Sequence, residues 1–302
     1  MKKQYLYRFF LLVLISAVGI FVVGKLRPEP ISSQVQKEKF WSDKVHSTNK
    51  YDLIFEGDSR IYRGIDPKSV SKELKGLRVL NFGFSSGGHN ELIFKEVENR
   101  LRNDKIIVLG LTPYSLTPKA QANKHYLQEK NRSQKDVFNR RFINPLFSFF
   151  DPIKPTDVIY YNDTIPGYYE RFKKNGWVES RKIPFNPKAA LPGYVKDFES
   201  NIVSEDVLKN LFEQIEKWIQ KDIKVFALRM PTTEEMEKLE NELSGFKENE
   251  IRKSIEEIGA KWIEVDNRYD YVSYDGSHLD RESARIFSSY IGRKINEVIN
   301  EK

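Results

Sequence analysis

The stretch YDLIFEGDSR at residues 51–60 decides the fold. Its first six residues are mostly apolar and β-prone, as in a buried strand, and Gly57 permits the tight turn that follows. Ser59 therefore stands at the carboxyl end of a strand, immediately before a helix-like segment. Open parallel sheets present reactive groups at this point, which makes Ser59 a candidate nucleophile. By itself, the motif is common by chance and is better explained by Asp58 or Ser59 capping a helix.

The rest of the chain alternates strand-like and helix-like segments. Four further apolar runs have the length and composition of buried strands: 78–82, 105–111, 224–228 and 261–265. Three stretches carry apolar residues at helical spacing, as on the core-facing side of helices: 93–101, 208–219 and 284–298. This alternation predicts an α/β domain over 51–302, with a five-stranded parallel sheet covered by helices on both faces.

One long segment, 112–204, breaks this pattern. It holds 9 of the 13 prolines and 7 of the 15 tyrosines, and it has no clear period. A connection of this length is uncommon inside a compact domain. We expect it to form a cap over the site that binds substrate through basic and aromatic side chains: Lys124, Arg132, Arg140, Arg141, Arg171, Tyr160, Tyr161 and Trp177.

The N-terminus predicts a membrane anchor over 1–25. Residues 9–24 are uncharged and mostly apolar, and flanking basic side chains can extend this run to the length of a bilayer. Lys2, Lys3 and Arg8 precede the run, against Lys25 and Arg27 after it, which favours the N-terminus inside and the domain outside the cytoplasm. The alternative is a cleaved signal peptide. Residues 26–50 read as a polar stalk, with room for one short helix.

Composition limits the chemistry. The formal charge is +7 and the pI is about 9.2, so the surface would attract an anionic polysaccharide, an anionic membrane or nucleic acid. No nucleic-acid recognition motif is present, and we expect no such partner. Cysteine is absent, which excludes disulfides, a cysteine nucleophile and thiolate metal sites. No motif for a metal or an organic cofactor occurs, so none is expected.

A second motif lies near the other end of the chain. Asp275 precedes His278 by three residues, in the sequence YDGSHL at 274–279, directly before the last helix-like segment. A serine needs a base to take its proton, and histidine is the usual one. A carboxylate in this position can accept the second ring N–H and fix the tautomer. Taken alone, His278 is better explained as a surface residue near a helix start.

Together these motifs resemble the SGNH (GDSL-type) hydrolase superfamily. Gly57-Asp58-Ser59, Asn81-Phe82-Gly83 and Asp275-x-x-His278 carry the resemblance, which covers 51–302 apart from the insertion. It implies a flavodoxin-like, three-layer domain with Ser59 as nucleophile, His278 as general base and acid, and Asp275 as the orienting carboxylate.

The resemblance also implies an oxyanion hole. The backbone N–H groups of Ser59 and Gly83 would supply two donors. The family's third block has an Asn at the position where this chain has Thr112, after 109–111, so Thr112 would supply the third donor through its hydroxyl. This departure is more similar to the branch of alginate O-acetyltransferases and the lipoteichoic-acid D-alanylation protein. Asn81 and Arg229 are the expected substrate-binding side chains.

The sequence thus predicts a membrane-anchored serine acyltransferase or esterase outside the cytoplasm. Its substrate would be O-acyl groups, acetyl first among them, of a cell-envelope polysaccharide, and a membrane-bound O-acyltransferase is a candidate partner. A simple esterase is one alternative. Another is a non-catalytic accessory protein that binds a glycan or a membrane-bound O-acyltransferase.

Overall fold

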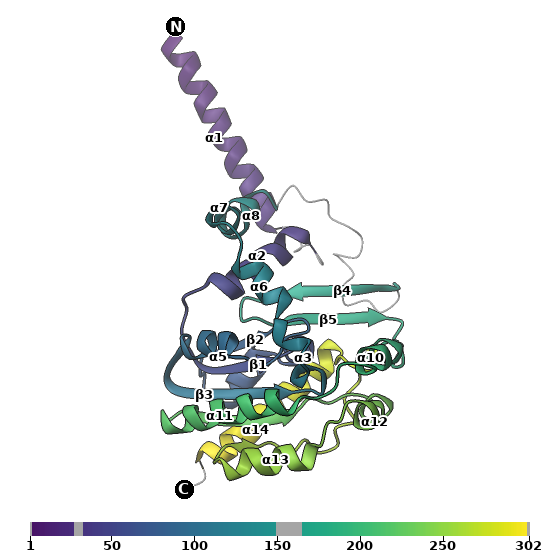
Figure 1. Cartoon of the computed structure of the whole chain (residues 1–302). Coiled ribbons are helices and arrows are strands. Elements are labelled where there is room, and N and C mark those ends of the chain that lie inside the picture. Colours follow the sequence, from purple (N-terminus) through teal and green to yellow (C-terminus); the bar gives the residue numbers. More distant parts are fainter. Residues whose placement is uncertain (1, 27–32, 149–164, 301–302) are drawn as a thin grey trace.

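A computed structural model describes residues 2–26, 33–148 and 165–300 (Figure 1). Its centre is a five-stranded sheet in the order β2-β1-β3-β6-β7, and every neighbouring pair is parallel. The strands are β1 (Tyr51–Gly57), β2 (Val79–Gly83), β3 (Leu101–Leu111), β6 (Lys224–Arg229) and β7 (Lys261–Trp262). The α/β class and the parallel sheet are confirmed, and the strand order is that of flavodoxin-like folds.

Alternate residues of each strand send their side chains to opposite faces of the sheet. On one face, Ile54 of β1 packs in a core with residues of α2, α5, α11 and α13; on the other, Leu53 and Phe55 pack with residues of α3, α4 and α14. The helices are α2 (Gln34–His46), α3 (Ser59–Gly64), α4 (Pro67–Glu73), α5 (Glu91–Glu98), α11 (Glu205–Gln220), α13 (Glu248–Glu257) and α14 (Arg281–Asn300). Both faces are therefore buried, which explains why the strands read as continuous apolar runs.

The insertion adds elements that the sequence did not predict. Two strands, β4 (Gly167–Phe172) and β5 (Val178–Ile183), form a separate antiparallel pair. The helical elements of this segment are η1 (Tyr114–Leu116), η2 (Ala120–Ala122), α6 (Lys124–Lys130), α7 (Gln134–Phe138), η3 (Asn139–Ile143), α8 (Asn144–Phe147) and α10 (Leu191–Phe198); α12 (Glu234–Leu243) follows β6. The strands of this pair mix aromatic and charged residues, so periodicity does not reveal them.

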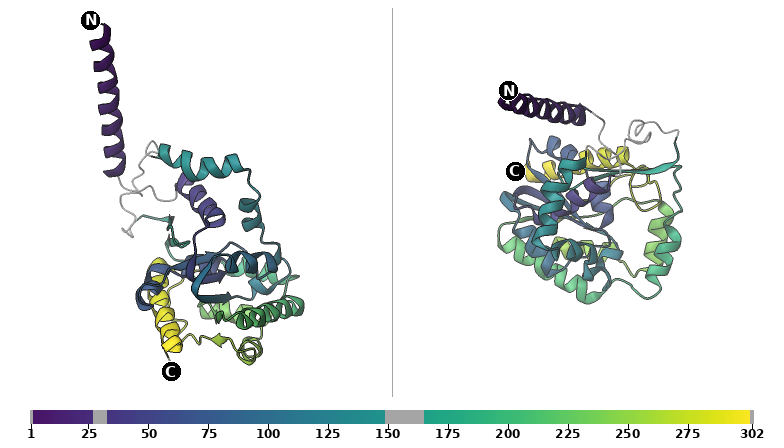
Figure 2. Two further views of the ribbon diagram at one scale, coloured as in Figure 1. Left: turned by 90° about the vertical axis from the view of Figure 1, so that its left-hand side faces the viewer. Right: turned by 90° about the horizontal axis from the view of Figure 1, so that it is seen from above.

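The first helix, α1 (Lys2–Leu26), stands apart from the domain (Figures 1 and 2). Its stretch Lys3–Gly24 is long and apolar enough to span a membrane, and none of it is buried in the protein. A signal sequence near an N-terminus would meet the same criteria. The helix is therefore compatible with either a retained anchor or a signal.

Most of the expected stalk is part of the domain. Helix α2 begins at Gln34 and buries Phe40, Trp41 and Val45 in the core. Lys44 is also buried; its ammonium group donates to the carbonyl oxygen of Gly83 at 2.7 Å and lies 5.1–5.8 Å from the centres of four aromatic rings. Burial, and then the nearby Arg100, lower the pKa of Lys44. Helix α2 is thus fixed directly to the end of β2.

Candidate active site

Ser59 lies at the carboxyl end of β1, as the first residue of α3. Gly57 makes this turn possible: a Cβ there would lie 2.7 Å from the carbonyl oxygen of Gly110 on the neighbouring strand, and its φ is +153°. Asp58 caps the helix, because its carboxylate accepts a hydrogen bond from the backbone N–H of Arg60 at 2.9 Å. The cap and the nucleophile candidate are therefore two different residues, and Ser59 is free of the capping role.

The structure brings Ser59, His278 and Asp275 into one hydrogen-bonded line. The Ser59 Oγ lies 2.9 Å from Nε2 of His278, and Nδ1 of His278 lies 2.9 Å from Oδ2 of Asp275. The His278 and Asp275 side chains are 17% and 18% exposed, so the line can be reached from outside. An imidazole that is hydrogen-bonded to a hydroxyl through one nitrogen and to a carboxylate through the other can take up and return the hydroxyl proton.

The loop before α14 holds Asp275 as an anion. Its Oδ1 accepts hydrogen bonds from the backbone N–H groups of Ser277 and His278, at 2.9 and 2.8 Å. Burial by itself would raise the pKa of Asp275, but the hydrogen bond and charge of His278 and these two backbone donors lower it to about 2. Asp275 is therefore ionised through the whole neutral range.

The insertion supports this loop directly. The backbone N–H of Asn186 donates to the carbonyl of Tyr274 at 2.9 Å, and that of Ala190 donates to the carbonyl of Asp275 at 3.0 Å. Tyr194 of α10 is 2.8 Å from the Ser277 hydroxyl through its own hydroxyl. Residues 186–194 thus form part of the framework of the candidate site, in addition to any covering role.

Two of the three expected oxyanion donors are already engaged. The Gly83 N–H donates to Oδ1 of Asn81 at 3.1 Å, and the Thr112 hydroxyl donates to Oδ2 of Asp58 at 2.6 Å. Thr112 is fully buried. A hydroxyl has one proton, and this one is used within the protein. The expectation that Gly83 and Thr112 serve as donors is corrected for this conformation; the Ser59 N–H has no protein acceptor among the described residues.

A turn that the sequence analysis overlooked offers other donors. Residues 84–87 form a tight turn closed by a hydrogen bond of 3.1 Å from the Gly87 N–H to the Phe84 carbonyl, with Ser86 at φ +51°. Within the described part of the chain, the N–H groups of Ser85 and Ser86 have no acceptor. The turn follows β2, the strand next to β1 in the sheet. A non-glycine residue with positive φ in a loop after a strand was not readable from the sequence.

Neither expected substrate-binding side chain is accessible. Asn81 is fully buried, and its amide donates to the carbonyls of Ile61 and Ile65 at 2.7 and 2.8 Å. Arg229 is 3% exposed and donates to Glu240 and Glu248 at 3.0 and 2.9 Å. Both assignments are therefore corrected: Asn81 holds α3 against β2, and Arg229 belongs to a buried ion-pair network.

Arg60, the residue after Ser59, belongs to the same network. It is 1% exposed and pairs with Glu240, and its Nε donates to the Ser277 hydroxyl at 3.0 Å. Glu240 is itself fully buried and pairs with Arg229 as well. Arg60 therefore links the start of α3 to the loop that carries Asp275 and His278. Removing one member of such a network leaves an uncompensated buried charge.

A second serine, histidine and carboxylate meet close to the same sheet edge. His89 contacts Glu56 of β1 through Nδ1 and lies 3.2 Å from the Ser115 Oγ through Nε2. Glu56, His89 and Ser115 are 2%, 1% and 0% exposed, respectively. His89 is thus a core residue, and the cap of α5 is the neighbouring Asn90.

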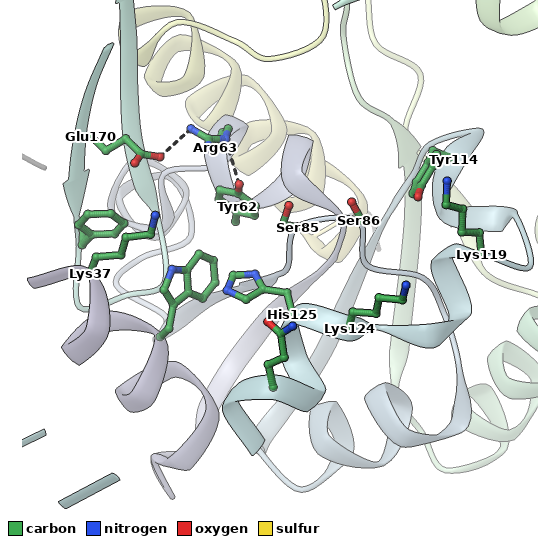
Figure 3. A pocket seen from close by; sticks show the side chains of 13 residues that line it. Lys37, Tyr62, Arg63, Ser85, Ser86, Tyr114, Lys119, Lys124, His125 and Glu170 are labelled. Atoms are coloured by element: carbon green, nitrogen blue, oxygen red, sulfur yellow. Dashed lines mark hydrogen bonds and ion pairs between the residues drawn. The ribbon is translucent and has the colours of Figure 1, made fainter. Parts of the chain in front are cut away.

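A pocket of about 570 Å³ opens beside α3 and the 84–87 turn (Figure 3). Its lining residues come from α2, α3, the turn, the start of the insertion, α6 and β4: Lys37, Trp41, Tyr62, Arg63, Ser85, Ser86, Tyr114, Lys119, Lys124, His125, Gln128, Glu170 and Phe172. Arg63 is paired with Glu170 at 3.0 Å. Lys37 and Lys124 form no ion pair within the described residues, so the pocket has a net positive charge.

Only part of the expected basic and aromatic set lies in this pocket. Lys124 lines it, whereas Arg132, Arg140 and Arg141 are held in ion pairs with Glu129, Asp136 and Asp43. Trp177 is 2% exposed and donates to the Arg63 carbonyl, so it cannot stack on a ligand. Tyr160 and Tyr161 lie outside the described residues, and Arg171 has contacts of its own. Across the described ranges, no group of three metal-ligating side chains occurs.

Comparisons with known proteins were made for the whole chain. No family model matches it, and no curated protein matches it. Among solved structures, one similar chain is from Streptococcus pneumonia and is provisionally described as a platelet activating factor. The two share 12% identity at a TM-score of 0.38, over 87% of this chain and 91% of that one. Two structures of carbohydrate acetylesterases from Sinorhizobium meliloti share 10% identity at a TM-score of 0.37, over 82% of this chain and 98% of theirs. Likenesses of this strength assign neither a family nor a function to the chain.

Proposed function

We propose that this chain is a serine esterase or acyltransferase that acts on O-acyl groups, acetyl first among them, of an anionic cell-envelope polysaccharide. One observation carries the proposal: Ser59, His278 and Asp275 form a continuous hydrogen-bonded line that remains partly exposed at the carboxyl edge of the sheet. Buried polar groups are usually paired for stability, but a partly exposed serine gains little stability from an imidazole. Chemistry explains the arrangement better.

In the acylation step, the Ser59 oxygen attacks the carbonyl carbon of the ester while Nε2 of His278 accepts the hydroxyl proton. The imidazolium is stabilised by Asp275, which stays ionised because its pKa is about 2. The tetrahedral intermediate then collapses: the bond to the alcohol breaks, and His278 gives its proton to the departing oxygen. The acyl group remains on Ser59 as an ester.

The developing oxyanion needs donors that are not already engaged. We assign this role to the backbone N–H of Ser59 together with those of the 84–87 turn, in place of Gly83 and Thr112. In deacylation, His278 takes a proton from water or from a sugar hydroxyl, and that oxygen attacks the acyl carbon. Ser59 recovers its proton from His278 as it leaves. Water gives hydrolysis and a sugar hydroxyl gives transfer.

The pocket beside α3 supports an anionic substrate. Lys37 and Lys124 are unpaired cations within the described chain and face a volume of about 570 Å³, with the half-buried Phe172 as an aromatic wall. Uronate or phosphate groups of a glycan would pair with the cations, while a sugar ring packs on Phe172. If α1 is retained as an anchor with the N-terminus inside, the enzyme would meet such a polymer on the side of that membrane that faces away from the cytoplasm.

A serine-directed fluorophosphonate tests the nucleophile. We expect stoichiometric labelling of the wild type on Ser59, located by peptide mass spectrometry, and none in Ser59→Ala. Ser115→Ala is the matched control, because Ser115 also lies beside a histidine but is fully buried. Labelling that persists in folded Ser59→Ala would refute the assignment. A folded wild type that is never labelled and never cleaves an activated ester would instead indicate a non-catalytic accessory protein.

A second assay separates hydrolysis from transfer. The acyl-enzyme formed from an activated acetyl ester is challenged with a de-acetylated anionic polysaccharide, and free acetate and polymer-bound acetate are measured. Transfer predicts that polymer acetylation rises at the expense of acetate release. Lys37→Gln combined with Lys124→Gln should lower polymer acetylation and leave small-ester turnover within about twofold, because rim charges contribute modestly and separately from the reacting atoms.

A further inference from the structure

One helical stretch leaves an apolar face uncovered by the described protein. Elements α7, η3 and α8 run without a break over 134–147. Five large apolar side chains project from it, at one position and then at two adjacent pairs about one helical turn apart: Phe138 54%, Phe142 52%, Ile143 36%, Leu146 63% and Phe147 58% exposed. We call these five residues the apolar face. A contiguous exposed set of this kind marks a surface that binds something.

The opposite side of this stretch fixes its orientation. Arg141 pairs with Asp43 of α2 at 2.8 Å and donates to the His46 carbonyl at 3.3 Å. Arg140 pairs with Asp136 at 3.2 Å and lies 3.7 Å from Glu38 of α2. Both guanidinium groups are therefore engaged with the domain, and the apolar face cannot turn inward without breaking these pairs.

The apolar face lies close to the point where the chain leaves for α1. Its stretch packs on α2, and α2 begins at Gln34, eight residues after α1 ends at Leu26. Eight residues reach at most about 28 Å even when fully extended. Figures 1 and 2 show α7 and α8 beside α2, on the side of the domain toward α1. A membrane that holds α1 would thus be within reach of this face.

We propose that the apolar face lies on a lipid surface, with its side chains at the boundary between headgroups and acyl chains of the membrane that holds α1. The face has the chemistry of an interfacial helix: phenylalanine, leucine and isoleucine on one side, charged residues on the other. Protein interfaces usually combine aromatic residues with hydrogen-bonding groups, whereas the five residues of the apolar face carry none on their side chains. The proposal goes beyond the catalytic function and rests on α1 being a retained anchor.

This contact sets the orientation of the candidate site. A single flexible tether would let the domain rotate freely, whereas a tether and a second contact hold one side of it against the membrane. Helix α2, which carries Lys37 and Trp41 of the pocket, is the element to which the apolar face is fixed. The pocket is thereby kept near the lipid surface, where a membrane-associated acyl donor or a nascent polymer would be presented.

The absence of cysteine in the chain allows a clean test. Full-length Phe142→Cys is labelled with an environment-sensitive nitrobenzoxadiazole dye and reconstituted into phosphatidylcholine/phosphatidylglycerol vesicles, with or without doxyl-labelled lipid. Leu243→Cys is the matched control: Leu243 is 42% exposed on α12, on the far side of the domain from α1 (Figure 1). Leu146→Cys gives a second, independent position on the apolar face.

We expect the dye at 142 and at 146 to shift to shorter wavelength on reconstitution and to lose more than half its emission with doxyl lipid. The dye at 243 should do neither. Equal quenching at 142 and 243 in protein that floats with vesicles would overturn the lipid contact alone. Protein that fails to float would overturn the anchor and this contact together, while the esterase assay still reports on the active site. A wavelength shift without lipid quenching that grows with protein concentration would assign the face to a second copy of the chain and also overturn the proposal.

Discussion

Two sets of serine, histidine and carboxylate meet at the same edge of the sheet, and they differ in access. In the first, Ser59, His278 and Asp275 are partly exposed, and the imidazole is the partner of the Ser59 hydroxyl. The second, formed by Ser115, His89 and Glu56, is sealed in the core; the Ser115 hydroxyl donates to the Thr112 carbonyl at 2.8 Å, so its proton is already used. Residue types and spacing alone do not make a nucleophile. The serine must also be reachable and hold a proton that the histidine can take.

The largest contrast is expected from the two serines. Ser59→Ala should lower kcat/KM for an activated acetyl ester by about 10⁴-fold or more, because the covalent route is lost. Ser115→Ala should lower it by less than about tenfold. Steady-state kinetics on both variants, with circular dichroism as a check on folding, provide the measurement. If Ser59→Ala keeps more than a tenth of wild-type activity, Ser59 is not the nucleophile and the proposed difference between the two serines is wrong.

Asp275→Asn should come next, with a loss of about 10³–10⁴-fold in kcat, since an amide can favour the wrong tautomer of His278. The same variant has a stability signature. Because the folded pKa of about 2 is below the ordinary value of 3.8, ionised Asp275 contributes stability above pH 4, and this contribution is lost as pH falls through about 2. The melting-temperature difference between wild type and Asp275→Asn should therefore shrink between pH 6 and pH 2.5. A difference that is constant over this range would mean that the carboxylate is not held as an anion.

The parts of this site that sequence predicted are those fixed by local geometry. A serine after the first strand and an Asp-x-x-His before the last helix are placed by the elements that flank them, so Ser59, Asp275 and His278 come together once the sheet forms. The parallel sheet was readable for the same reason, because strands buried on both faces are continuous apolar runs.

The site residues that were assigned wrongly depend on side-chain contacts that local geometry does not determine. Whether the Gly83 N–H is free depends on the Asn81 side chain, and whether the Thr112 hydroxyl is free depends on Asp58 of another strand end. Arg229 is buried because Glu240 of α12 reaches it. Hydrogen-bond partners chosen by the tertiary fold leave no periodic trace in the sequence. The docking of α2 was missed because it too depends on the tertiary fold, and the β4–β5 pair was missed because its strands mix aromatic and charged residues.

The two histidines should behave in opposite ways. His89→Gln should cost about 2–4 kcal/mol of stability, because Glu56 would keep its burial and lose the hydrogen bond to the imidazole, while activity of the folded protein falls by less than about tenfold. His278→Gln should remove activity and change stability by less than about 1 kcal/mol, given its partial exposure. Urea denaturation and ester kinetics on both variants test this. A folded His89→Gln protein with wild-type stability but no activity would place the buried set in the catalytic machinery.

Thr112→Val tests the corrected oxyanion hole with a smaller effect. A direct oxyanion donor typically contributes about 10²–10³ in kcat. Thr112 instead donates a hydrogen bond to the capping residue Asp58. We therefore expect Thr112→Val to lower kcat by about tenfold or less and stability by about 1–2 kcal/mol. Kinetics and thermal unfolding of the same preparation separate the two effects. A loss of 10³-fold at unchanged stability would return Thr112 to the role of oxyanion donor.

The smallest effect is expected from a third histidine, His125, which lines the pocket with its ring centre 4.2 Å from that of Trp41. Burial, opposed in part by Glu129, and the nearby cations led by Lys44 lower its pKa to about 4. Its folded pKa lies below the ordinary value of 6.5, so the unfolded chain binds the proton more readily. Stability should therefore be complete above about pH 6.5 and decrease as pH falls from there toward 4.

His125→Gln removes this titration. Relative to the variant, the wild type should lose about 1–2 kcal/mol of unfolding free energy between pH 7.5 and pH 5, a figure reduced from the full shift because the ring is partly exposed. Urea denaturation at both pH values measures it, with His278→Gln as the control for a histidine in a different setting. A wild type and variant whose stabilities run in parallel with pH would show that the imidazole is hydrated and charged. Water would then reach the His125 ring in the pocket. The ring, which we expect to be neutral, would instead add a positive charge beside Lys37 and Lys124.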